Sequence, residues 1–469
     1  MADTDQTVTA AQSDAGEYTN DAYALDDTLR DTLRHALEQG DKAAIDALLH
    51  PLHPADIADL LEQVSSAERE RWLTLWSRGI NGEVLSELDW GLRKDVIALL
   101  PTDVVTQAAR TLDSDDVVDL IEDLEDDQQT TILTALDPQD RVAAEQALTY
   151  PEESAGRLMQ REVVHAPEHW TVGNAIDHLR ANKRDLPEQF YHIVLTDPRM
   201  KPKGHVALGR MLATARTTRL SDISEDRFRV IPATQDEDDV AYAFNQYHLI
   251  SAPVVDDTGR LVGVITIDDA MTVLDEAAEE DILKLAGVGE ESSLSDRVLD
   301  TAKQRFPWLF VNLVTSILAS LVIAQFDAAI AQIVALAVLM PIVASMGGNA
   351  GTQSLTVAVR ALATKDLTRS NLARVVGREA AVGAINGVVF AVVMGAVGIV
   401  WFGTPMLGVV IGIAMILNLV IAGLAGILVP VVLDRLRIDP ALASGAFVTT
   451  VTDVVGFFAF LGLATVMLI

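Results

Sequence analysis

The sequence predicts a multi-domain protein with an all-α superhelical N-terminal domain, a tandem α+β pair, a connecting helix and an α-helical membrane domain of five spans. Charge is the first observation: up to Ala302 the chain carries 61 Asp and Glu against 26 Lys and Arg, whereas the rest is apolar and slightly basic. The second is the order of patterns, which are helical at first, then strand-like, then continuously apolar. The acidic half argues against nucleic-acid binding, and the lack of cysteine excludes disulfides and thiolate metal sites.

Residues 1–24 are polar and acidic, which predicts a disordered tail and not a signal peptide. In the N-terminal domain, 25–150, three stretches share one outline: "HPADIADLLEQV" (53–64), "PTDVVTQAARTL" (101–112) and "DSDDVVDLIEDL" (113–124). Each has a capping residue or proline, then acids, then apolar positions at helical spacing. Such repeats predict helices stacked into a superhelix, with an ordinary helical bundle as the alternative.

The pattern changes in the next region, 151–272. Strand-like runs occupy 190–196, 228–233, 251–257 and 260–269 and alternate with helical stretches. Two units begin alike, "VVHAPEHWTVGNAI" at 163–176 and "FRVIPATQDEDDVAYAF" at 228–244, which indicates a tandem α+β repeat. An acidic connecting helix at 273–303 is then expected to lead to the membrane domain at 304–469.

Five apolar stretches are each long enough to cross a hydrocarbon core of about 30 Å. They are roughly Phe306–Phe326, Ala328–Ala358, Ala380–Phe402, Met406–Leu433 and Pro440–Ile469. Lys and Arg gather before the first span, between the second and third, and between the fourth and fifth. By the positive-inside rule, the N-terminal half is expected in the cytoplasm and the C-terminus outside, with the spans in the cell (plasma or inner) membrane.

The second span contains "PIVASMGGNAGTQS" (341–354), in which a proline, two glycines and several polar side chains weaken a membrane helix. Irregular backbone at membrane depth is tolerated where it is packed in protein or lines water. A pore-lining or hinge role is therefore expected, and close packing through small residues is the alternative. Met340 and Met346 are interpreted as packing residues.

Asp453 stands alone in the last span, within "FVTTVTDVVGFFAF" (447–460). A charged carboxylate at this depth costs at least about 2.5–3.5 kcal/mol, and no Lys or Arg lies at comparable depth in any span. Asp453 is therefore expected to serve a cation or a proton; the alternative is a protonated carboxyl bonded to Thr450 or Thr452. A ring of such acids from two or more chains suits a hydrated Mg²⁺ better than Ca²⁺. The other acids of this half, given no role, are Asp327, Asp366, Glu379, Asp434 and Asp439.

These segments resemble the MgtE family of bacterial magnesium channels. The stretches "PIVASMGGNAGTQSLTVAVRALAT" (341–364) and "DPALASGAFVTTVTDVVGFF" (439–458) are similar to its two most diagnostic segments. The domain order matches too: a helical N domain, a cystathionine-β-synthase (CBS) pair, a plug helix and five spans. The resemblance implies a homodimeric, gated Mg²⁺ channel in the lipid bilayer, and not an enzyme. It implies an ion path along Asp453, Asn349, Gly348 and Gly347.

The resemblance also implies that cytosolic Mg²⁺ closes the pore by binding between acidic faces of the N domain, the CBS pair and the plug helix. The positions that match this sensor are Glu83, Asp115, Asp119, Asp236, Asp238, Asp269, Glu280 and Asp281. The chain departs from the family pattern at His248, Thr272 and Ala277, where some members have acids, and at Gly445, where some have an amide. Two like charges about 8 Å apart repel by roughly 2 kcal/mol, and a bridging divalent ion reverses the sign.

Two further pairs of residues are candidates for binding. Thr266 and Asp269 in "GVITIDD" (263–269) resemble the ribose- and phosphate-contacting pattern of CBS pairs that bind ATP or related nucleotides; a strand end and a helix cap are the alternative. His165 and His169 are interpreted as structural because Pro167 separates them. Two rival functions stay open: a secondary transporter of divalent cations such as Co²⁺ or Ni²⁺, with Asp453 as its ion or proton site, and a membrane-anchored nucleotide sensor.

Overall fold

The computed structural model describes residues 27–122, 124, 126–183, 186–187, 189–225, 228–288 and 298–469. The chain forms two compact units. The first comprises the residues up to Glu237 together with Ile250–Thr266, and the second comprises Asp238–Leu249 together with Ile267–Ile469. The tail expected at 1–24 lies outside the described residues.

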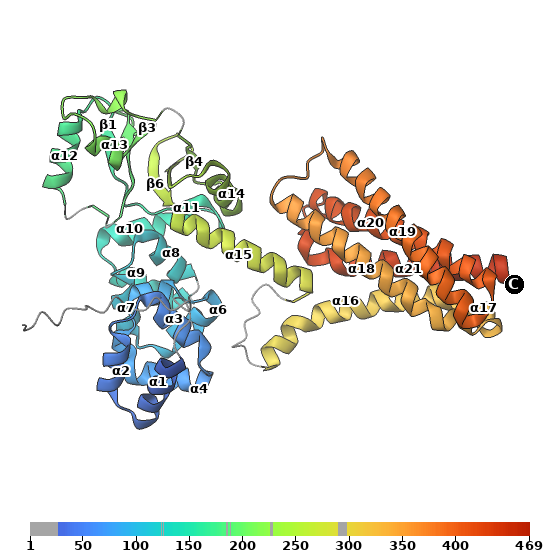
Figure 1. Ribbon diagram of the computed structural model, residues 1–469. Coiled ribbons are helices and arrows are strands. Elements are labelled where there is room, and N and C mark those ends of the chain that lie inside the picture. The colour runs from blue at the N-terminus through green and yellow to red at the C-terminus, as the bar shows by residue number, and fades with distance from the viewer. Residues whose placement is uncertain are drawn as a thin grey trace, which may run out of the picture. The chain divides into compact units, whose positions relative to one another are not determined.

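Short helices build the first part of unit 1 (Figure 1). They are α1 (Asp27–Gln39), α2 (Lys42–Leu49), α3 (Pro54–Gln63), α4 (Ser66–Trp76), η1 (Ser77–Gly79), α5 (Gly82–Ser86), α6 (Trp90–Leu99), α7 (Thr102–Ala109), α8 (Ser114–Glu122), α9 (Asp126–Ala135) and α10 (Pro138–Ala147). The three stretches with the shared outline fall on α3, α7 and α8. Contacts run in sequence order, α3 with α5, α5 with α7 and α7 with α9, as expected of helices stacked into a superhelix.

Two small sheets with the same topology follow in unit 1. The elements are α11 (Ala155–Leu158), β1 (His165–Pro167), α12 (Val172–Ala181), β2 (His192–Thr196), β3 (Pro202–Ala207), α13 (Leu208–Leu212), η2 (Leu220–Asp222), β4 (Ile231–Pro232), β5 (Ser251–Val255) and β6 (Leu261–Thr266). In each sheet the first strand pairs parallel to the second and the second antiparallel to the third. The register shifts at matching places, Leu195/Thr196 and Val254/Val255, so the tandem α+β repeat is confirmed.

The strand predictions hold best where the apolar runs are longest. The runs at 190–196, 251–257 and 260–269 contain β2, β5 and β6, whereas the run at 228–233 supplies the two-residue strand β4. Neither β1 nor β3 was among the strand-like runs. In β3 the residues Pro202, Lys203 and Gly204 interrupt any alternation, and the strand forms because β2 offers it an antiparallel partner.

Unit 2 contains most of α14 (Glu237–Tyr247), then α15 (Ile267–Ala286), and the apolar part of the chain. The remaining helices are α16 (Val298–Ala324), α17 (Asp327–Gln332), α18 (Ala335–Ala363), α19 (Leu372–Phe402), α20 (Pro405–Arg435) and α21 (Pro440–Leu468). Among the described residues, five of these helices are long and apolar enough to cross a membrane. This agrees with the predicted number of spans.

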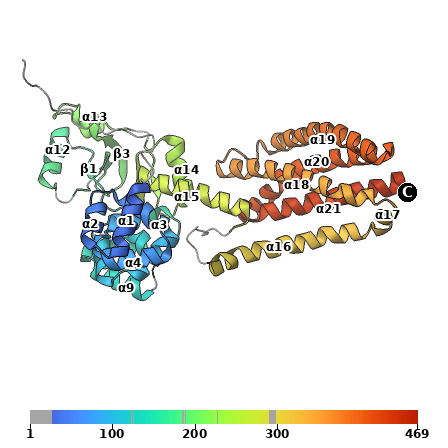
Figure 2. The ribbon, with the colours of Figure 1, turned by 60° about the horizontal axis from the view of Figure 1, so that its bottom comes forward.

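The five long helices lie side by side (Figure 2). Helix α20 is the most buried of them. It contacts α18, α19 and α21, while α16 packs along α21. Small residues allow the close approach: a Cβ at Gly383 would lie 2.5 Å from the carbonyl oxygen of Leu419, and one at Gly426 would lie 2.6 Å from that of Gly351. Packing through small residues is typical of membrane helices, where lipid supplies no hydrophobic driving force between them.

The irregular backbone expected within 341–354 is not observed. Helix α18 continues from Ala335 to Ala363 with Pro341 inside it, and the interruption falls earlier, between α17 and α18. Neighbouring helices can support a proline in a membrane helix, and α18 packs against both α20 and α21. The excess length of the predicted span becomes the separate short helix α17.

Candidate functional site

One face of α18 is polar and exposed in the single chain. Ser345, Asn349, Thr352 and Thr356 recur at helical spacing and are all exposed. The opposite face, which includes Val343, Gly347, Gly351, Ser354 and Leu355, is buried in the bundle. A polar face on a membrane-spanning helix is unfavourable against lipid, so it needs water or another protein surface over it.

The predicted ion-path glycines differ in their surroundings. Gly347 packs against Asn418 of α20, because a Cβ at this position would lie 2.4 Å from Asn418 Nδ2. At Gly348 a Cβ would meet nothing within 4 Å. Asn418 is fully buried and donates from Nδ2 to the carbonyl oxygen of Val343 at 2.7 Å. Gly347 therefore serves helix packing, and Gly348 belongs to the more open side of α18.

Asp453 lies on α21 next to residues that pack on α18. A Cβ at Gly351 would lie 2.7 Å from Val448 Cγ1 and 3.4 Å from Thr452 Cγ2. Thr452, fully buried, directly precedes Asp453, which is partly exposed. The helices that carry the predicted ion-path residues are thus in direct contact.

The carboxylate of Asp453 receives no hydrogen bond from the nearby threonines. Thr450 Oγ1 donates to the carbonyl oxygen of Ala446 at 2.6 Å, and Thr452 Oγ1 donates to that of Thr449 at 2.9 Å. Within the described part of the chain no ion pair reaches Asp453. The alternative of a carboxyl held by Thr450 or Thr452 does not match these contacts.

A second group of acids lies where the end of α15 meets the start of α21. Lys284 Nζ is 2.6 Å from Glu280 Oε1 and 2.7 Å from Asp439 Oδ2, and the lysine side chain is buried. The other oxygen of Asp439 accepts from the backbone N–H of Ala441 at 2.7 Å and so caps α21. Asp439, to which the sequence assigned no role, therefore joins two helices.

Electrostatics in this group follow from burial and from the neighbouring charges. Burial alone would lower the pKa of Lys284, but its hydrogen bonds to Asp439 and Glu280 raise the pKa above its usual value. The pKa of Asp281 is raised, mainly by burial and then by the charge of Asp439. Asp238 also contributes to the rise. The structure thus brings Glu280, Asp281 and Asp439 together around an ammonium group of the chain itself.

Another lysine of unit 2 contacts α14. Lys365, in the connection between α18 and α19, forms an ion pair with Asp239, and its Nζ lies 4.8 Å from the centre of the Tyr242 ring. Lys365 has φ of 56°, in the left-handed region. The predicted sensor position Asp238 is the residue next to this ion pair.

The predicted sensor residues of unit 1 lie on two neighbouring helices and one loop. Glu83 is on α5, and Asp115 and Asp119 are on α8, which contacts α5. Arg93, itself buried, forms an ion pair with Asp119. The backbone of Asp236, in a loop, forms an isolated antiparallel β-bridge with that of Ser154. In both units, then, a predicted sensor acid is already paired with a basic side chain.

Asp269 is separated from Glu280 and Asp281, the other predicted sensor acids of α15. It lies in the first turn of the helix, and Glu280 follows eleven residues later, about 16 Å along the axis. Thr266 ends β6 and is buried.

Among the described residues no group of three or more His, Asp or Glu is arranged to hold a metal ion. Acids from different elements would have to converge to bind a regulatory Mg²⁺.

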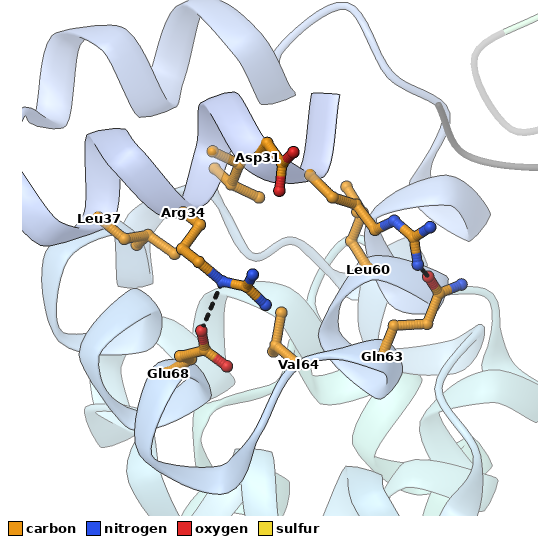
Figure 3. A pocket seen from close by; sticks show the side chains of 9 residues that line it. Asp31, Arg34, Leu37, Leu60, Gln63, Val64 and Glu68 are labelled. Carbon is orange, nitrogen blue, oxygen red and sulfur yellow. Dashed lines mark hydrogen bonds and ion pairs between the residues drawn. The ribbon is translucent and has the colours of Figure 1, made fainter. Parts of the chain in front are cut away.

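A hollow of about 340 Å³ lies between helices α1, α3 and α4. Figure 3 shows Arg34 reaching Glu68 across it, at 2.9 Å between Nε and Oε1. Arg30 bonds Gln63 in the same way at 2.9 Å. These contacts join α1 to α3 and α4, so the hollow is interpreted as a helix junction.

Histidines cluster between the two sheets of unit 1. His192 Nδ1 lies 2.8 Å from Ser251 Oγ, and the His192 and His205 rings are 4.3 Å apart. Burial, and then the neighbouring His205, lowers the pKa of His192 to about 4. His165 lies in β1, so no helix presents it together with His169.

Three family comparisons match separate parts of the chain. The family described as divalent cation transporter matches residues 340–463, the MgtE intracellular N domain matches 52–153, and the CBS domain matches 220–276. The first match contains the polar face of α18 and Asp453.

Curated relatives match over most of the chain. A protein of Thermus thermophilus named Magnesium transporter MgtE is 31% identical over 450 residues, which cover 95% of this chain and 99% of the relative. A protein of the same name from Bacillus subtilis is 28% identical over 89% of this chain and 93% of its own length. Among solved structures, the cytosolic domain of the Mg²⁺ channel MgtE in complex with ATP is 30% identical. It has a TM-score of 0.48, and the match covers 52% of this chain and 99% of that one.

Proposed function

The chain belongs to the MgtE family of magnesium transporters, and as a member of it we propose that it forms a channel-like pore that imports Mg²⁺ into the cytoplasm. The observation that carries the proposal is the pairing of two features on adjacent helices. One is the exposed polar face of α18, and the other is the Asp453 carboxylate of α21, which no described basic side chain neutralises.

The chemistry of these residues suits a cation that keeps its water. Mg²⁺ dehydrates reluctantly and is usually bound through one or two carboxylates together with several waters. Two chains that pair over the polar face of α18 would present two Asp453 carboxylates to one path, with Asn349 and Gly348 beside it. A homodimer therefore gives the polar face a function and supplies the second acid.

Orientation follows from the basic residues at the helix ends. Lys303 and Arg305 lie in the first part of α16, Arg360 and Lys365 near the end of α18, and Arg435 at the end of α20. By the positive-inside rule these ends face the cytoplasm of a cell with an inner or plasma membrane. The acidic half would then sense the cytosol, and the C-terminus would lie outside.

Regulation by cytosolic Mg²⁺ is the second part of the proposal. The acids Glu83, Asp115, Asp119, Asp236, Asp238, Asp269, Glu280 and Asp281 would bind Mg²⁺ between elements and keep the pore closed. The support for it is that like charges lie together here: the pKa of the half-buried Asp281 is raised by burial and then by the charge of Asp439. A cation placed among these carboxylates would therefore be favourable. ATP or a related nucleotide at Thr266 and Asp269 is a further part of this proposal, because Thr266 ends β6 directly before α15.

The direct test is Mg²⁺ influx into proteoliposomes that contain an internal Mg²⁺ dye. Wild type should take up Mg²⁺. The initial rate of uptake should be at least about tenfold lower in Asp453→Asn, because asparagine has nearly the size of aspartate but no charge. Equal dimer content of both proteins in detergent is the control for assembly. Equal influx would overturn the assignment of the ion site.

The same preparation separates the rival functions. A channel needs the electrochemical gradient of Mg²⁺ alone, whereas a secondary transporter that uses Asp453 for protons would depend on an imposed pH gradient. A membrane-anchored nucleotide sensor would give no influx in either protein. Uptake that is independent of the pH gradient in wild type is the result expected here.

A further inference from the structure

Lys284 joins the last turn of α15 to the first turn of α21. Its ammonium group bridges Glu280 of its own helix, at 2.6 Å, and Asp439, at 2.7 Å. The side chain is 9% exposed, which is unusual for a lysine unless its charge is paired. Asp439 offers one oxygen to Lys284 and the other to the start of α21, so the lysine holds the residue that caps the helix.

Apolar packing surrounds this ion pair. Leu285, the next residue on α15, packs against a cluster made of Leu355, Val359, Ala441 and Val448. A Cβ at Gly445 would lie 3.9 Å from the carbonyl oxygen of Leu285. The end of α15 therefore rests on α21 and on the apolar cluster that joins α21 to α18, the helices that carry the candidate ion path.

We propose that Lys284 is a tethered cation that docks the end of α15 on α21 without bound Mg²⁺. It is a positioning residue, since it acts on the ion path through α21 and does not touch the path itself. The inference rests on the proposed function for its consequence: Lys284 anchors the end of α15 on α21 in the open and the closed channel alike, so that regulatory Mg²⁺ acts on the rest of α15.

The physical reason is the count of like charges at the junction. Glu280, Asp281 and Asp439 lie around Lys284, and the charge of Asp439 raises the pKa of Asp281. Without the ammonium group, the carboxylates of α15 and α21 would repel one another, and docking would need another cation. Lys284 therefore competes with Mg²⁺ for Glu280, and it lowers the dependence of docking on Mg²⁺.

The test uses the absence of cysteine from the chain. With Leu285→Cys and Gly445→Cys as the sole thiols, mild oxidation should form a disulfide when α15 is docked. With EDTA, the lysine-containing protein should cross-link efficiently, and Lys284→Gln should cross-link at least about fivefold less. Addition of Mg²⁺ should restore cross-linking in Lys284→Gln and change the lysine-containing protein little.

Lys284→Arg is the matched control, because it keeps a charge that can reach both acids. It should cross-link in EDTA like the lysine-containing protein. Non-reducing gels separate disulfides within a chain from those between chains. Equal cross-linking of Lys284→Gln and its parent in EDTA would overturn the proposal, as would a loss in Lys284→Gln that Mg²⁺ fails to restore. The readout is docking itself, so it stands apart from any failure of Mg²⁺ influx.

Discussion

Asp439 and Asp453 are carboxylates of the same helix, α21, fourteen residues apart, yet their surroundings are opposite. Asp439 lies at the helix start and is held by Lys284 at 2.7 Å. Asp453 lies in the middle of an apolar helix, and in the described part of the chain its carboxylate has neither a basic partner nor a threonine donor.

The difference indicates what each acid can do. A carboxylate with a cation supplied by the chain is neutralised permanently, so it can fix the position of a helix. A carboxylate without one has to obtain its cation from solution, and an ion that arrives from solution can also leave. This contrast separates an acid that positions a helix from an acid that binds a moving ion.

The largest effect is expected at the acids of α15 that the proposal assigns to the Mg²⁺ sensor. Asp269→Asn, Glu280→Gln and Asp281→Asn together should raise the Mg²⁺ concentration that closes the proposed pore by at least about tenfold, because they remove the charge that the proposal assigns to regulatory Mg²⁺. The measurement is influx at a series of Mg²⁺ concentrations on the cytosolic side.

Asp275→Asn with Glu279→Gln is the control for that triple variant. Both residues are exposed on the same helix, α15, and neither was assigned to the sensor. This pair should leave the closing concentration nearly unchanged. An equal shift in both variants would mean that net charge, and not these positions, sets the response.

A single added methyl group tests the difference between the packed and the open side of α18. Gly347→Ala places a Cβ 2.4 Å from Asn418 Nδ2, so it should cost about 1–3 kcal/mol through overpacking. Gly348→Ala, which meets nothing within 4 Å, should not be destabilising. Thermal unfolding in detergent measures both. Equal unfolding temperatures would show that the contact with Asn418 can relax freely.

The smallest effect concerns a group that loses its charge through burial. The pKa of His192 is about 4 when folded and near 6.5 when unfolded, so stability should fall as pH drops from about 6.5 to 4. The loss should be roughly 2 kcal/mol after allowance for partial exposure. Hydrogen exchange of 192–196 in the full chain, corrected for intrinsic rates, measures it. His192→Gln should flatten the pH dependence, and an unchanged slope would assign it to another group.

The sequence was sufficient for features that repeat or extend along the chain. Apolar periodicity placed α3, α7 and α8, and continuous apolar runs placed the five long helices. Asp453 was identifiable because a charge in such a run is costly by itself. The polar residues of 341–354 were identified too, although their helix proved continuous.

Contacts between distant segments were beyond this reasoning. Lys284 and Asp439 are 155 residues apart, and each alone looks like an ordinary charge at a helix end. Asn418 was missed because one amide in α20 gives no signal until Gly347 and Gly456 are seen to pack against it. Glu379, which was given no role, belongs to no recognisable sequence pattern either. Its carboxylate nevertheless accepts a hydrogen bond from Ser354 Oγ at 2.9 Å.

The most direct test exchanges the two acids of α21 in one experiment. Mg²⁺ influx into proteoliposomes would be compared for wild type, Asp453→Asn and Asp439→Asn, where asparagine can still cap the helix. The account predicts that influx is lost in Asp453→Asn and is at least as fast as wild type in Asp439→Asn, because the second variant removes only the ion pair between α15 and α21 and leaves the Asp453 carboxylate in place. Influx that persists in Asp453→Asn, or that is lost equally in both variants, would contradict it.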